Sequence, residues 1–185
     1  MNTLYVFDFD DTLVHSHSTI IVVHADGTES ELTSAEYATY KEQPGDVMDY
    51  SDFDKNPEQA ARIDQVFTEL EQALSSAGAA NVVVLTARSN TTPVVEFLAD
   101  QGLSGVQVVG TGSTNPMDKA KYVLDRVLND EYDEVHVYED SAKNIRTIKR
   151  VVGKLGVQLF TNRVTTTGGK TVVVPESANR KLSKR

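Results

Sequence analysis

The sequence has 185 residues, of which 39% are apolar and 24% charged, a composition typical of one globular domain that excludes a disordered or fibrous protein. It contains no cysteine, which excludes disulfides, thiolate metal sites and cysteine nucleophiles and fits a reducing cytoplasm. The net charge of −9 disfavours nonspecific nucleic-acid binding, although the last seven residues hold four of the 18 basic side chains. The longest apolar runs are too short to span a bilayer, so we expect a cytoplasmic protein without a membrane partner.

Five short segments rich in β-branched residues predict strands, at residues 4–9, 81–86, 105–110, 133–140 and 156–160. Their apolar residues are mostly continuous, as in strands that are buried on both faces of a parallel sheet.

The clearest helix is predicted at residues 56–78. Asn56 is expected to cap it, Pro57 suits the first helical position and Gly78 ends it. The residues with helical spacing on its apolar face are Ile63, Val66, Phe67, Leu70 and Leu74.

Three further helices are expected, beginning at the cap and proline pairs of Thr92 and Asn115 and after Ser141. The apolar face of the last one comprises Ile145, Ile148, Val152 and Leu155. Strands and helices alternate, which predicts an α/β fold with a Rossmann-like, doubly wound parallel sheet. Such sheets bind their ligands at the carboxyl ends of the strands.

Two segments interrupt this alternation within the single domain expected over residues 1–185. Residues 15–55 contain a predicted hairpin, a short helix after Thr33 and an acidic loop, so we interpret them as a small inserted flap after the first strand. Residues 161–185 predict a second hairpin, turning at Gly168 and Gly169, followed by a basic tail.

Polar side chains collect at the predicted strand ends. Asp8 and Asp10 follow the first strand and Thr86 and Arg88 the second, while Lys119 lies near the start of the helix after the third. The fourth strand ends with Glu139, Asp140 and Asn144. Carboxylates from two strands share a divalent cation readily, and a hydroxyl with an ammonium group holds a phosphoryl group.

This set resembles the haloacid dehalogenase (HAD) superfamily of phosphohydrolases. The sequence DFDDTL, which includes Thr12, is similar to its first motif, VVVLTAR to its second, Lys119 to its third and YEDSAKN to its acidic fourth. The FDFDDTL and DDS-like variants of the motifs, with the short insert, also resemble phage-encoded members. The sequence TAR is similar to a motif of polynucleotide 3′-phosphatases.

The resemblance implies a magnesium-dependent phosphohydrolase in which Asp8 is the nucleophile and Asp10 the proton donor and acceptor. Mg²⁺ would be held by the Asp8 carboxylate, the Asp10 backbone carbonyl and Asp140, with Glu139 and Asn144 supporting these ligands. Thr86 and Lys119 would bind the phosphoryl oxygens.

The resemblance further implies that Arg88 and Thr12 contact the substrate, a phosphorylated molecule such as a nucleotide or a polynucleotide end.

Two residues depart from the usual pattern: Asp11 stands where many members have glycine, and Glu139 stands where an aspartate or glycine is more usual. Lys121 competes with Lys119 for the third motif. A receiver-like signalling domain and a non-catalytic phosphate-binding module remain alternative functions.

Overall fold

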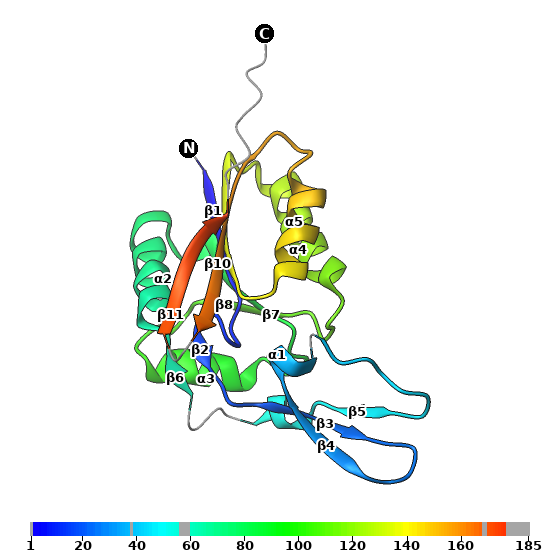
Figure 1. Ribbon diagram of the computed structural model, residues 1–185. Coiled ribbons are helices and arrows are strands. Elements are labelled where there is room, and N and C mark those ends of the chain that lie inside the picture. Colours follow the sequence, from blue (N-terminus) through cyan, green and yellow to red (C-terminus); the bar gives the residue numbers. More distant parts are fainter. Residues whose placement is uncertain (1, 38, 56–59, 168–169, 177–185) are drawn as a thin grey trace.

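The computed structural model describes residues 2–37, 39–55, 60–167 and 170–176, and in this part of the chain six strands form a central sheet (Figure 1). Their order is β11-β10-β9-β1-β7-β8. The strands are β1 Thr3–Phe7, β7 Val82–Thr86, β8 Gln107–Gly110, β9 Glu134–Glu139, β10 Gln158–Thr167 and β11 Lys170–Glu176. All neighbouring pairs are parallel except β10 with β11. The chain is therefore a mixed α/β protein, compatible with the predicted Rossmann-like class.

Helices cover both faces of this sheet (Figure 1). Helices α2 (Asp64–Ala77) and α3 (Thr92–Asp100) pack on one face, and α4 (Pro116–Asp130) and α5 (Ala142–Val152) on the other. Side chains that alternate along β1 enter the two cores in turn, since Phe7 faces α2 and α3 while Val6 faces α4 and α5. This burial on both faces explains the continuous apolar runs of the strands.

The sheet order reverses between β9 and β1. From β1 the chain proceeds to β7 and β8 on one side, and then crosses to β9 and β10 on the other. The carboxyl ends of β1 and β9 therefore lie side by side, with Phe7 opposite Tyr138. Ligands of open α/β sheets bind at such a reversal.

The predicted helix caps are confirmed in two places. The Asn115 side chain accepts a hydrogen bond from the Met117 amide at the start of α4, and the Ser141 hydroxyl accepts one from the Asn144 amide at the start of α5. Gly78 ends α2 with a φ of 80°, as predicted. The cap of α3 differs, because Thr92 is already helical and Thr91 precedes it.

The predicted start of α2 is wrong. The helix begins at Asp64, because Ala61–Arg62 (β6) pairs with Val14–His15 (β2) as a short antiparallel ladder. The expected cap at Asn56 and Pro57 lies outside the described residues. Leu155 is also not part of the α5 face, since this helix ends at Val152 and the Leu155 side chain is exposed.

The predicted flap contains more structure than a hairpin. Strands β3 (Thr19–Val23) and β4 (Glu29–Thr33) form the expected hairpin, and α1 (Ser34–Tyr37) follows Thr33 as predicted. Strand β5 (Val47–Asp49), which the sequence analysis missed, pairs with the other edge of β3. A short 3-10 turn, η1 (Ser51–Asp54), follows it. The flap lies beyond the end of the sheet where β1 finishes (Figure 1).

Two other parts of the chain complete the described structure. A second 3-10 turn, η2 (Ala79–Asn81), joins α2 to β7. Strand β10 combines the predicted strand at 156–160 with the first arm of the predicted hairpin, while Gly168, Gly169 and the basic tail lie outside the described residues. In the part of the chain with assigned positions, no helix has the length and apolar character needed to cross a membrane.

Gly110, at the end of β8, allows close contact with the loop after β7. A Cβ atom there would lie 2.3 Å from the Arg88 carbonyl oxygen. We expect Gly110→Ala to lower the free energy of unfolding by about 2 kcal/mol or more, because this backbone must shift. Gly27→Ala is the control, with positive φ but open space around its Cβ, and should cost only about 1 kcal/mol. Equal losses in urea unfolding would contradict the close contact.

Candidate active site

The chain turns sharply where β1 ends, and this turn presents Asp8 at the sheet edge. The Asp8 amide donates to the Tyr138 carbonyl at 2.9 Å, which extends the pairing with β9 to the site itself. The amides of Leu13 and Val14 then both donate to the Phe9 carbonyl. Asp11 adopts the left-handed conformation in this turn, with a φ of 58°, a region that aspartate tolerates better than most residues.

Asp8 is buried and has two protein partners. Lys119 Nζ donates to its Oδ1 at 2.5 Å, and the Thr12 hydroxyl donates to its Oδ2 at 3.0 Å. Lys119 Nζ also donates to Glu139 Oε2 at 2.9 Å. Lys121 is exposed, so the structure brings Lys119 rather than its competitor to the site.

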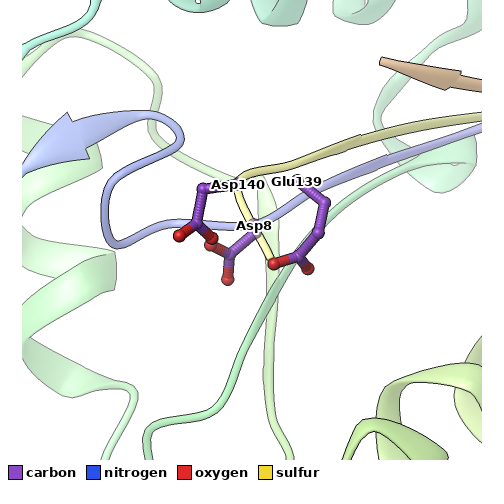
Figure 2. Close-up of side chains that lie close together, drawn as sticks. All are labelled: Asp8, Glu139 and Asp140. Carbon is purple, nitrogen blue, oxygen red and sulfur yellow. The ribbon is translucent and has the colours of Figure 1, made fainter. Parts of the chain in front are cut away.

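Asp8, Glu139 and Asp140 form a compact acidic cluster among the described residues, with one ligand atom of each within 4.8 Å of the others. Figure 2 shows the three carboxylates pointing to the same side of the chain, with Asp8 between the other two. Thr12 links two members of the cluster, because its hydroxyl also accepts a hydrogen bond from the Asp140 amide at 3.1 Å.

Burial and mutual repulsion oppose the ionised forms of these acids. Desolvation, followed by the charge of Glu139, raises the pKa of Asp8 to about 7 despite the contact with Lys119. The same two causes raise the pKa of Asp140. Burial disfavours the charged form of Lys119, but the carboxylates of Asp8 and Glu139 outweigh it and raise the pKa of this ammonium group.

The cluster fits a hard divalent cation. Its oxygen donors are those that Mg²⁺ prefers, and three crowded carboxylates face one ammonium group in the described part of the site. Glu139 is the member least available as a ligand, because Oε2 accepts from Lys119 while Oε1 accepts from the Ser141 amide and from Asn144 Nδ2. Asp8 and Asp140 are therefore the side chains that would hold the ion, and Glu139 and Asn144 would support them.

The Asp10 side chain pairs with Arg88. Arg88 Nε donates to Asp10 Oδ2 at 2.9 Å and a terminal nitrogen donates to Oδ1 at 2.6 Å, a bidentate pair. Arg88 was expected to contact the substrate, but its side chain is only 1% exposed. Thr12, for which we expected the same role, is fully buried with its hydroxyl bound to Asp8 and Asp140.

Thr86 ends β7 and is buried beside this pair. Its hydroxyl accepts a hydrogen bond from the Arg88 amide at 3.2 Å, and no direct hydrogen bond joins it to Asp8 within the described residues. The amide of Thr111 binds the Thr86 carbonyl and that of Gly112 binds the Arg88 carbonyl. The end of β7, with Thr86, and the loop after it, with Arg88, are thus held by the segment after β8.

Sequence analysis missed the contacts that several residues make near the site. Arg163 Nε donates to the Asp140 carbonyl at 3.4 Å, and the residue was overlooked because β10 was expected to end at Phe160. Asp11 pairs with His15, whose other ring nitrogen contacts the Thr171 hydroxyl at 3.2 Å. The spacing of four residues is a contact signal only on a helix, and His15 lies in strand β2, so no local pattern predicted this pair.

Comparisons with known proteins identify no relative: no family model, curated protein or solved structure matches the chain. The interpretation of the site therefore depends on its own geometry and chemistry.

The raised pKa of Asp8 predicts how stability depends on pH without metal. Between pH 3.8 and about 7 the folded chain keeps a proton that the unfolded chain has released, so the free energy of unfolding should fall as the pH rises. Asp8→Asn should flatten this fall and be more stable than wild type at neutral pH.

Urea unfolding across a pH series in EDTA measures the effect. Asp54→Asn, which changes an exposed flap carboxylate, is the control and should follow the wild-type profile. If Asp8→Asn also keeps the wild-type slope, Asp8 is not the group that titrates.

Proposed function

We propose that this chain is a magnesium-dependent phosphomonoesterase with an HAD-like fold that acts through an aspartyl-phosphate on Asp8. The observation that carries the proposal is the buried Asp8 carboxylate at the reversal of the sheet, 2.5 Å from Lys119 Nζ and beside Asp140. An enzyme of this class needs a nucleophile, a cation for the transferred group and a metal site within a few ångströms of each other. The buried Asp8 carboxylate, the Lys119 ammonium group and the acidic cluster at the sheet edge support these three roles.

In the proposed reaction, an Asp8 oxygen attacks phosphorus and the bond to the leaving-group oxygen breaks. Asp10 gives that oxygen a proton, and then takes a proton from the water that hydrolyses the aspartyl-phosphate. Lys119 is placed to neutralise charge on the phosphoryl oxygens, and Thr86 is the hydroxyl expected beside it. Bound Mg²⁺ would supply further neutralisation of that charge.

A receiver-like or non-catalytic phosphate-binding domain is the alternative. A receiver domain accepts its phosphoryl group on the third strand, and here the segment after the third parallel strand, residues 111–115, contains no carboxylate. The buried nucleophile candidate instead follows β1 and has a second carboxylate, Asp10, two residues later. This pair favours turnover over stable phosphorylation.

The flap favours small phosphomonoesters, such as nucleotides, over polynucleotide ends. Residues 15–55 contain nine carboxylates and two lysines, so a polyanion approaching this side of the site would be repelled. Arg163 is the cation available for a second anionic group of a small substrate, because its terminal nitrogens have no protein partner among the described residues. A small substrate with few phosphate groups, such as a nucleotide, therefore suits this arrangement better than a polynucleotide.

Asp8→Asn should abolish hydrolysis of every phosphoester, because the variant lacks the nucleophile. Asp10→Asn should lower kcat by about 100-fold or more on alkyl phosphates, which need a proton on the leaving oxygen, and by less on p-nitrophenyl phosphate. Steady-state rates with Mg²⁺ on a panel of nucleotides, sugar phosphates and phosphorylated oligonucleotides measure both effects. Wild-type activity that survives in purified Asp8→Asn would disprove the covalent route.

Asp140→Asn should raise the Mg²⁺ concentration that gives half-maximal activity by roughly ten- to hundredfold, by analogy with the loss of supporting groups at metal sites. Asn144→Ala is the matched control and should have a smaller effect, because Asn144 contacts Glu139 rather than the cation position. The assignment of Asp140 fails if the two variants and wild type share one half-saturation value in a magnesium titration.

A further inference from the structure

Arg88 is buried between the site and the flap, and its donors are distributed over both. Two nitrogens bind the Asp10 carboxylate, at 2.9 and 2.6 Å. The other terminal nitrogen donates to the Phe53 carbonyl in η1 at 2.5 Å. The terminal nitrogen that binds Asp10 also reaches the Ser18 hydroxyl in a longer contact of 3.4 Å. The guanidinium group thus joins Asp10 to two separate segments of the flap.

Aromatic rings enclose this guanidinium group. Its central carbon lies 5.4 Å from the centre of the Phe9 ring and 5.2 Å from that of Phe53. Phe9 belongs to the turn that carries Asp8 and Asp10, and Phe53 belongs to the flap. Rings within about 6 Å attract a cation and exclude water from its hydrogen bonds. Arg88 therefore has one polar and one aromatic contact with the turn, and one polar and one aromatic contact with the flap.

Every nitrogen of this side chain already has a protein partner, and the side chain is 1% exposed. A substrate group would have to break the bidentate pair with Asp10 or displace Phe53 to reach it. A buried guanidinium group that loses a partner pays a large desolvation cost. These contacts suit a residue that fixes the position of another side chain.

We propose that Arg88 is a positioning residue that fixes the carboxylate of Asp10 and couples it to the flap. The inference builds on the proposed function, because it concerns the orientation of the proton-transferring group. The planar guanidinium fork holds both carboxylate oxygens in one orientation, which a lysine cannot do. A flap segment that moves away from Arg88 would also release this constraint on Asp10.

A double-mutant cycle tests the link between Arg88 and Asp10. Arg88→Lys should lower kcat on an alkyl phosphate by about tenfold to 100-fold, as expected when a reacting group is displaced by about 1 Å, with little change in KM. In the Asp10→Asn background the same change should cost about twofold at most, since the group that Arg88 positions is already lost. The control is Arg126→Lys on α4. Arg126 also pairs with a carboxylate, that of Asp130, and lies over an aromatic ring, that of Tyr132, so this change should leave both rates unchanged.

Hydrogen exchange tests the link to the flap without using activity. The Phe53 amide bonds to the Tyr50 carbonyl, and the Thr19 amide bonds to the Asp52 carboxylate. Both amides should exchange several-fold faster in Arg88→Lys and in Asp10→Asn, and at the wild-type rate in Arg126→Lys. Unchanged exchange in both site variants would overturn the coupling.

The kinetic outcomes separate this inference from the proposed function. In one outcome, wild type is active and Asp8→Asn is not, Arg88→Lys raises KM, and the losses of activity caused by Arg88→Lys and Asp10→Asn multiply in the double variant. Arg88 then binds substrate, and only the positioning role is wrong. If wild type hydrolyses no phosphoester, the proposed function is wrong. The exchange rates then test the coupling of Asp10 to the flap without activity data, and faster exchange in the variants supports that coupling.

Discussion

The ammonium group of Lys119, held between the carboxylates of Asp8 and Glu139, is the interaction on which the rest of the site depends. Burying these carboxylates without a partner would cost several kcal/mol each, so the sheet edge could not otherwise hold them. One ammonium group does not balance the cluster that Asp140 completes, and the pKa of Asp8 stays raised. The local charge is therefore incomplete in a way that a divalent cation would correct.

The topology explains why these groups meet. The reversal of strand order places the ends of β1 and β9 side by side, so Asp8 and Glu139 arrive from different parts of the sequence at one edge. Lys119 comes from a third segment, near the start of α4, where the cap at Asn115 fixes the first turn. A helix start that moved by one residue would turn the ammonium group about 100° away from Asp8.

Local signals predicted the elements that local interactions determine, and missed those that distant pairing creates. Strand composition and the caps at Asn115 and Ser141 were sufficient for β7, β9, α4 and α5. The start of α2 was not predictable in this way, because Ala61–Arg62 pairs with Val14–His15, far away in the sequence. In the site, residue types at the strand ends indicated which groups would gather, but not that Thr12 and Arg88 would use their donors within the protein.

The direction of the proposed reaction gives the flap its significance. In-line displacement requires the leaving group to lie opposite the attacking oxygen, which in the proposed reaction is an Asp8 oxygen at the sheet edge. In that reaction the leaving group would point away from the sheet, toward the side where η1 and Ser18 contact Arg88. If the sheet edge binds the phosphoryl group, which all phosphomonoesters share, discrimination among them would depend on the flap. The excess of carboxylates in the flap would then act on the part of the substrate that differs.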